Sequence, residues 1–141
     1  MQTGLTAFDT VAKINGISLD LRSIIREFSL GEEEIEVEEL LLIMKQFDFK
    51  AKVKTLNVDN IPDNYPLPAV ILQKNRKYSV LLKADKVKKH VLIYSIEDNK
   101  TKDISYEELF ELSENKFIIL SHKLINSQIK FGFKWFFNEI L

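Results

Sequence analysis

The first third of the chain carries apolar residues at helical spacing. Between Thr3, a residue type that caps helices, and the pair Asn15-Gly16, apolar side chains recur every three or four positions. A second apolar stripe follows Ser18 and ends at Leu30-Gly31. A glutamate run then leads into an apolar block, which indicates a third helix over about residues 36–47. The pattern therefore predicts three consecutive helices.

From Phe49 onward the period of the hydrophobic pattern changes from 3.6 to 2. Phe49, Ala51 and Val53 alternate with lysines, which predicts a half-buried strand with a lysine face. Further strands are predicted over residues 69–72, 77–82, 90–96 and 117–120, with a loop holding all three prolines over 59–68. The pair Ser105 and Glu108 has capping-box spacing and predicts a short helix before the last strand. Helices followed by an antiparallel sheet indicate an α+β domain.

Composition restricts the chemistry that the chain can perform. Its 141 residues fit one domain, and 45% are hydrophobic, so a packed core is expected. The 20 basic residues against 21 acidic ones argue against a nucleic-acid binder, which usually needs a basic excess. The chain has no cysteine, two histidines and no glycine-rich phosphate loop or metal-binding motif. A cysteine nucleophile, a disulfide and a thiolate metal site are thereby excluded within these residues.

Charge is unevenly distributed along the chain. Residues 1–48 hold 4 basic and 10 acidic residues, whereas residues 49–141 hold 16 and 11. The acidic run over residues 32–39 is interpreted as the solvated start of the third helix. The stretch 131–141 packs five aromatic residues into seven positions. We therefore expect a domain over residues 1–126 and an aromatic linker over 127–141 that leads toward a membrane domain.

Four short motifs and their order carry a resemblance to a known family. They are Thr3-Gly4-Leu5 with Ala7, Pro68-Ala69-Val70 followed by Arg76 to Leu81, Leu92 to Ser95, and the ending Phe131 to Phe136. In these motifs the chain resembles the papain-like peptidase domain of peptide-exporting ABC transporters, which removes double-glycine leaders. It is more similar to the inactive version in haemolysin-type exporters of type I secretion systems. The resemblance implies a papain-like fold, with N-terminal helices packed on an antiparallel sheet.

The resemblance also implies a degenerate active site. Active members carry cysteine at the start of the first helix, histidine in the central hairpin and aspartate at the end of the next strand; here these positions hold Thr3, Lys77 and Ser95. Threonine lacks the acidity of a thiol, a cationic lysine is a poor general base, and serine cannot hold an imidazolium. Gln2 does not match the position of the family's oxyanion glutamine. No catalytic residue is expected, although a Thr3–Lys77 pair would resemble the Ser-Lys variants of the triad.

The function implied is recruitment of an unfolded exported protein, which carries a C-terminal secretion signal and often glycine- and aspartate-rich calcium repeats. The expected location is the cytoplasmic face of a bacterial inner membrane. Expected partners are the membrane and nucleotide-binding domains of the same transporter and a membrane fusion protein, with no nucleic acid. No cofactor or metal is expected in this domain, since ATP and Mg belong to the full-length transporter. A peptidase with a non-cysteine nucleophile and a stand-alone interaction module are the alternatives.

The expected binding surface is a basic groove beside the degenerate site, suited to an extended acidic segment. Its positive side chains come from two turns, and two tyrosines supply aromatic contacts unless they serve core packing. The candidates are Lys74, Arg76, Lys77, Tyr78, Lys86, Lys88, Lys89 and Tyr94.

Overall fold

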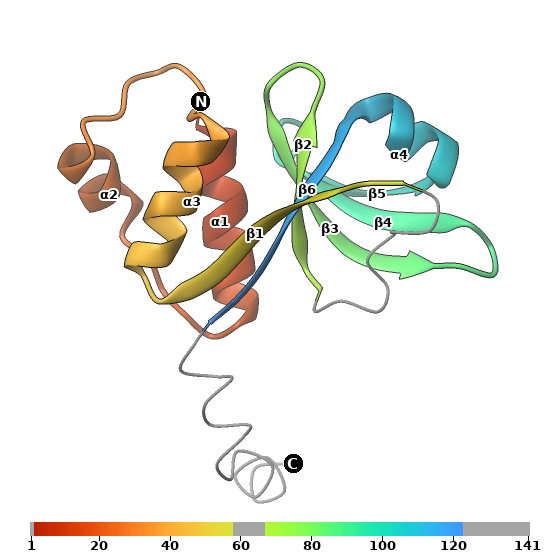
Figure 1. Cartoon of the computed structure of the whole chain (residues 1–141), viewed down its shortest axis with the longest axis horizontal. Coiled ribbons are helices and arrows are strands. Elements are labelled where there is room, and N and C mark those ends of the chain that lie inside the picture. The colour runs from red at the N-terminus through yellow and green to blue at the C-terminus, as the bar shows by residue number, and fades with distance from the viewer. Residues whose placement is uncertain (1, 58–66, 123–141) are drawn as a thin grey trace, which may run out of the picture.

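The computed structural model describes residues 2–57 and 67–122 (Figure 1). The elements in chain order are α1 (Thr3–Ile14), α2 (Leu21–Glu27), α3 (Val37–Gln46), β1 (Phe49–Thr55), β2 (Ala69–Gln73), β3 (Tyr78–Asp85), β4 (His90–Ser95), β5 (Lys100–Ser105), α4 (Tyr106–Leu112) and β6 (Ser113–His122). The strands form one antiparallel sheet in the order β1-β6-β2-β3-β4-β5. Helices α1 to α3 lie to one side of this sheet and α4 to the other (Figure 1).

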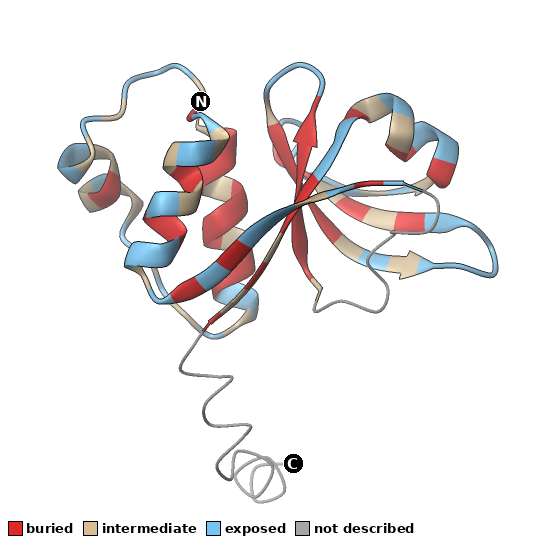
Figure 2. Ribbon diagram, viewed as in Figure 1, coloured by how far each residue is buried: buried red, intermediate tan, exposed pale blue. Residues whose placement is uncertain are grey.

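The larger core lies between the sheet and the N-terminal helices. Helix α1 turns its buried face toward the sheet, and Phe8 meets Phe49 of β1 edge-on with ring centroids 5.1 Å apart. Leu40, Ile43 and Met44 of α3 complete this cluster and are fully buried (Figure 2). Helical spacing in α1 and α3, and alternation at Phe49 and Ala51 of β1, thus place three apolar faces on one core. Val53, expected on the same face of β1, is exposed.

A smaller core lies on the other face of the sheet, beneath α4. Ser105 caps α4 through its hydroxyl, which accepts from the Glu108 amide, and the reciprocal bonds of a capping box are present. Leu109 of α4 packs with Ile71, Leu81 and Phe117, which alternate with residues facing the larger core. The central strand β2 is buried along its whole length because both of its faces are covered.

The α+β architecture, with N-terminal helices on an antiparallel sheet, is confirmed. Strand β5 was not predicted, because its sequence KTKDIS lacks apolar alternation and it is an edge strand paired only with β4. The last strand is longer than expected and begins at Ser113. The prediction that Thr3 caps the first helix was wrong. Thr3 is the first helical residue of α1, and Gln2 occupies the cap position. Most of the predicted 59–68 loop, and the expected 127–141 linker with its boundary, lie outside the described residues.

Candidate functional site

The N-terminal end of α1 is closed by the carboxylate of Glu34, which belongs to the segment before α3. Glu34 Oε1 accepts from the Thr3 amide at 2.9 Å, from the Thr3 hydroxyl at 2.7 Å and from the Gly4 amide at 3.4 Å. The first amides of a helix have no intrahelical acceptor and carry partial positive charge. A residue 31 positions away therefore caps the helix in place of the Gln2 side chain, which makes no cap bond.

The Thr3 hydroxyl is fully engaged inside the protein. It donates to Glu34 and accepts from the backbone amide of Tyr78 at 2.9 Å, and Thr3 has no exposed surface. Gly4 allows this close approach, because a Cβ at that position would lie 2.7 Å from Ile35 Cγ2 and 3.0 Å from Tyr78 Cε2. Residues Thr3 and Gly4 thus join α1, β3 and the segment before α3 at one point.

The geometry does not make Thr3 a nucleophile. Its contact with Glu34 is as short as that of a nucleophile with its general base. However, the same carboxylate oxygen accepts from the Thr3 amide, which is the donor that would have to bind a developing oxyanion. Because the side chain is also buried, neither the hydroxyl nor the amide is accessible to a peptide bond.

The side chain of Gln2 holds the segment that carries Glu34. Gln2 Nε2 donates to the carbonyl oxygens of Gly31 and Glu33, both at 2.6 Å, and Gln2 Oε1 accepts from the Ile35 amide at 3.1 Å. These bonds satisfy backbone groups of a segment that is neither helix nor strand. Gln2 and Glu34 were not predicted as site residues.

The positions corresponding to histidine and aspartate lie at the other side of the β2–β3 hairpin. Lys77 is half-exposed, and its ammonium lies 3.7 Å from Glu97 Oε2. The Ser95 hydroxyl donates to Asp98 at 3.1 Å, in the turn that follows β4. Across residues 2–57 and 67–122, no hydrogen bond or ion pair connects Thr3, Lys77 and Ser95 with one another. The Thr3–Lys77 pair therefore lacks the contact that a Ser-Lys-type site requires.

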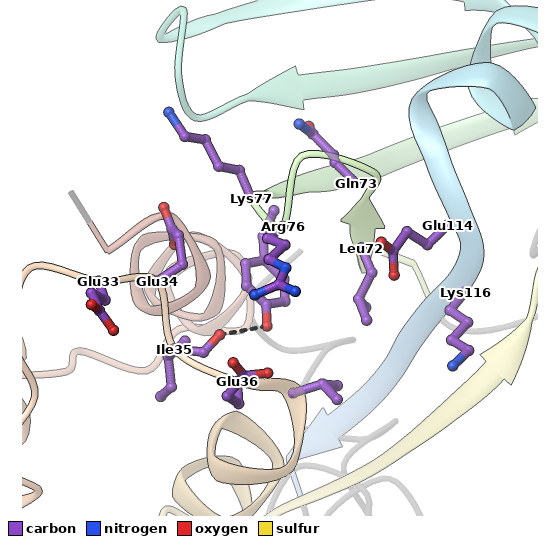
Figure 3. Close-up of a pocket in the computed structure, with 12 residues that line it drawn as sticks. Glu33, Glu34, Ile35, Glu36, Leu72, Gln73, Arg76, Lys77, Glu114 and Lys116 are labelled. Carbon is purple, nitrogen blue, oxygen red and sulfur yellow. Dashed lines mark hydrogen bonds between the residues drawn. The ribbon is translucent and has the colours of Figure 1, made fainter.

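A hollow of about 650 Å³ opens beside Thr3, between the segment before α3, the β2–β3 hairpin and β6. Its apolar lining comes from Ile35, Val37, Leu72 and Tyr78, and its charged lining from Glu33, Glu34, Glu36, Arg76, Lys77, Glu114 and Lys116. In Figure 3 the guanidinium of Arg76 lies in the middle of this hollow, with Glu36 below it, while Lys77 points away. Among the described residues, the Arg76 side chain has no hydrogen bond or ion pair.

The hollow is more acidic than the sequence suggested. Four glutamates and three cationic residues line it, so the hollow carries charges of both signs and not only the basic side chains expected to flank a groove. Burial is the main cause that raises the pKa of the Tyr78 phenol. The negative charges of nearby glutamates raise this pKa further; they are Glu36, Glu34, Glu38 and Glu114. The glutamate run was interpreted as the solvated start of the third helix, which holds for Glu38 and Glu39 in the first turn of α3. Its members Glu33, Glu34 and Glu36 also line the hollow.

The two tyrosines proposed as aromatic contacts have structural roles. Tyr78 is 4% exposed, and its hydroxyl donates to the carbonyl oxygen of Ile35 at 2.8 Å. Tyr78 also lines the hollow. Tyr94 is partly buried against the larger core, and its hydroxyl donates to the side chain of Asn99. A contact of either ring with a bound peptide stays a prediction.

The two basic turns do not form one surface. Lys74, Arg76 and Lys77 lie around the β2–β3 turn, whereas Lys86, Lys88 and Lys89 lie in the β3–β4 turn at the opposite end of β3. At about 3.3 Å per residue, the eight residues of β3 separate these turns by more than about 20 Å. Turns adjacent in sequence were mistaken for turns adjacent in space.

Comparison with known proteins decides the family. The sequence profile of the peptidase C39 family matches residues 1–124. This chain belongs to the peptidase C39 family. As a C39 domain without cysteine, it has a degenerate active site. It is 28% identical, over 98% of its length, to the leukotoxin translocation ATP-binding protein LktB of Pasteurella haemolytica-like sp. (strain 5943B). The C39 domain spans 20% of the length of that relative.

Solved structures show the same fold. The N-terminal peptidase C39-like domain of a toxin secretion ATP-binding protein from Vibrio parahaemolyticus superposes with a TM-score of 0.75 at 15% identity, covering 87% of this chain and 98% of that one. A double-glycine motif protease from an AMS/PCAT transporter, solved with its leader peptide, gives a TM-score of 0.72 at 13% identity and covers 84% and 83%. The papain-like fold expected from the resemblance is thereby confirmed.

Within residues 2–57 and 67–122 of the C39 domain, no helix is both long and apolar enough to cross a membrane. No group of three or more histidine or carboxylate side chains in those ranges is arranged to hold a metal ion.

Proposed function

We propose that this C39 domain recruits an unfolded segment of an exported protein without cleaving it, as part of a toxin-type translocation ABC transporter. The observation that carries the proposal is the contrast at α1, where a buried, fully bonded Thr3 stands beside an open hollow. The name of the LktB relative, a translocation ATP-binding protein, supports the transporter context. The leader peptide bound to the AMS/PCAT protease supports a peptide as ligand of this fold.

The hollow is the proposed binding surface. It offers the Arg76 guanidinium, which has no ion pair within the described part of the chain, for peptide carbonyls or carboxylates, and apolar contact at Leu72 and Val37. Glu36 and Glu114 flank these groups and favour a segment that also carries basic or amide side chains. Such a mixed lining suits an extended chain, whose main-chain and alternating side-chain groups reach polar and apolar contacts in turn.

Lys86, Lys88 and Lys89 are proposed as a second, separate contact for an acidic stretch of the same segment. An extended chain covers about 3.3 Å per residue, so more than about six residues are needed to reach from the hollow to the β3–β4 turn. An unfolded substrate meets this requirement without any rearrangement of its own structure. Lys77 contributes less, because it points away from the hollow and lies beside the opposite charge of Glu97.

The remaining partners are proposed from the transporter context. They are the membrane and nucleotide-binding domains of the same transporter, with ATP and Mg confined to the latter, and a membrane fusion protein in the assembled system. The domain would then work on the cytoplasmic face of the inner membrane.

The test is titration of the domain with a glycine- and aspartate-rich repeat protein, in its calcium-free unfolded form and its calcium-bound folded form. We expect the unfolded form to bind at least ~10-fold more tightly, and affinity to fall between 0.1 and 1 M salt as the Debye length falls from about 10 to about 3 Å. Arg76→Glu should weaken binding more than Lys88→Glu, which makes the same charge change at the far end of β3. Equal affinity for both forms, or no effect of Arg76→Glu, would remove the proposed site.

Cleavage is tested separately with a double-glycine leader peptide. Mass spectrometry should find the peptide intact after incubation with the domain. Specific hydrolysis after the glycine pair, abolished by Thr3→Val, would make the domain a peptidase with an unusual nucleophile.

A further inference from the structure

The position of Glu34 has a consequence for the degenerate site itself. In a papain-like site the carbonyl oxygen of the scissile bond becomes an oxyanion, which hydrogen bonds from the nucleophile's own backbone amide stabilise. Here the corresponding amide is that of Thr3, and it donates to Glu34 Oε1 at 2.9 Å. A carboxylate oxygen also carries negative charge, shared with its partner oxygen, and accepts the same hydrogen bonds as the oxyanion.

We propose that the Glu34 carboxylate occupies the oxyanion position and thereby blocks peptide carbonyl groups from the degenerate site. The segment that carries it, residues 31–36, lies over the end of α1 like a bound ligand. Gln2 fixes this segment at three backbone groups, and Tyr78 donates to the carbonyl oxygen of Ile35 within it. A peptide in the neighbouring hollow therefore lies beside the former catalytic centre and not in it.

The packing around the Glu34 carboxylate supports its occupation of the oxyanion position and not merely a chance contact at the surface. Glu34 Oε2 is buried and has no hydrogen-bond partner among the described residues, so the carboxylate is held by its other oxygen alone. Leaving a buried carboxylate oxygen unpaired is costly. The arrangement persists because Oε1 gathers three donors at the positive end of a helix of 12 residues.

The chain offers a clean probe, because it contains no cysteine. In Thr3→Cys the introduced thiol is the only one, and its alkylation by iodoacetamide reports both access to the site and the fraction of thiolate. A helix N-terminus lowers a thiol pKa below its usual value of about 8.5, whereas an adjacent carboxylate raises it. The two influences have opposite signs, so the pH dependence of alkylation tells an occupied site from an empty one.

We expect the thiol of Thr3→Cys to react at least ~100-fold more slowly than that of Thr101→Cys, which lies on the exposed strand β5. Its apparent pKa should lie above about 8.5. In Thr3→Cys with Glu34→Ala the rate should rise at least ~10-fold and the apparent pKa should fall below about 8.5. Equal rates with and without Glu34, or a low thiol pKa while Glu34 is present, would overturn the proposal.

Two further measurements distinguish occupation of the oxyanion position by Glu34 from a general destabilisation of the domain. Leu109→Ala destabilises the domain from the α4 side, so Thr3→Cys with Leu109→Ala shows how much alkylation comes from unfolding alone. That variant should leave the thiol pKa high. In the threonine-containing protein, Glu34→Gln should speed amide hydrogen exchange at Thr3 and Gly4 more than at residues of α3. Exchange accelerated equally in both helices would assign Glu34 a general stabilising role and contradict the occupation.

Discussion

The degenerate site has two corners, one at Thr3 and one at Lys77 and Ser95, and they differ in burial and in hydrogen bonding. The corner at Thr3 is buried, and both the threonine hydroxyl and the first helical amides are bonded within the protein. The corner at Lys77 and Ser95 lies beside the β2–β3 turn and the end of β4. There the half-exposed Lys77 makes one long ion pair with Glu97, and the buried Ser95 bonds to Asp98 of the following turn. Three elements meet at the first corner, whereas the second joins neighbouring turns.

Loss of the catalytic side chains therefore has different structural consequences at the two corners. A side chain at the start of α1 is part of the core, so whatever replaces a nucleophile there must find bonding partners. The Lys77 side chain remains in contact with water, and the Ser95 hydroxyl bonds only to Asp98 of the following turn, so both can change with less effect on folding. The variants below test this contrast through the free energy of unfolding.

Thr3→Val should give the largest effect, lowering the free energy of unfolding by about 3 kcal/mol. The substitution keeps the shape but leaves the buried Tyr78 amide and the Glu34 carboxylate without the hydroxyl. Thr10→Val on the same helix removes only a local bond to the Thr6 carbonyl and should cost less than about 1 kcal/mol. Urea denaturation measures both, and equal losses would contradict the special position of Thr3.

Gly4→Ala should cost about 2 kcal/mol, because its Cβ would meet Ile35 Cγ2 at 2.7 Å. The gain in helix propensity of about 1 kcal/mol offsets only part of this overpacking. Gly31→Ala is the matched control, since nothing lies within 4 Å of its Cβ. Thermal unfolding should show a lower midpoint for Gly4→Ala alone; a stabilised Gly4→Ala protein would show that the corner is loosely packed.

Tyr78→Phe should cost about 1 kcal/mol at neutral pH through the lost bond to the Ile35 carbonyl. Burial raises the pKa of Tyr78, with the nearby glutamates adding to the shift. Below pH 10 both folded and unfolded states keep the phenol proton, so this group adds no pH dependence. Above about pH 10 the unfolded state loses the proton first, and stability falls as pH rises. Denaturation between pH 8 and 11 should show a shallower decline for Tyr78→Phe than for the unsubstituted protein.

Lys77→Ala should change the free energy of unfolding by less than about 0.5 kcal/mol, and Ser95→Ala, which loses the bonds to Asp98, by less than about 1.5 kcal/mol. Lys77 is half-exposed and its ion pair with Glu97 is long, and the Ser95 hydroxyl bonds only within its own turn. A loss comparable to that of Thr3→Val in either variant would end the contrast between the two corners.

Much of the fold could be predicted from the sequence, since the apolar periods in α1, α3 and β1 follow directly from which faces are buried. Strand β5 could not, because an edge strand without apolar alternation gives no such signal. At the site, the resemblance indicated Thr3, Lys77 and Ser95. Glu34 was missed because its partner lies 31 positions away, and a carboxylate within a glutamate run has no local feature that sets it apart. The same lack of spatial information placed the two basic turns together.

The most direct test of the account is an amide NMR titration of the ¹⁵N-labelled domain with the calcium-free repeat protein. We expect chemical-shift changes at the amides of residues that line the hollow, in the ranges 33–37, 72–77 and 114–116. The chemical shifts of the Thr3 and Gly4 amides should stay unchanged. Shifts centred on Thr3 and Gly4, with Glu34 displaced from the end of α1, would show that substrate enters the former catalytic centre and would contradict a closed site beside an open one.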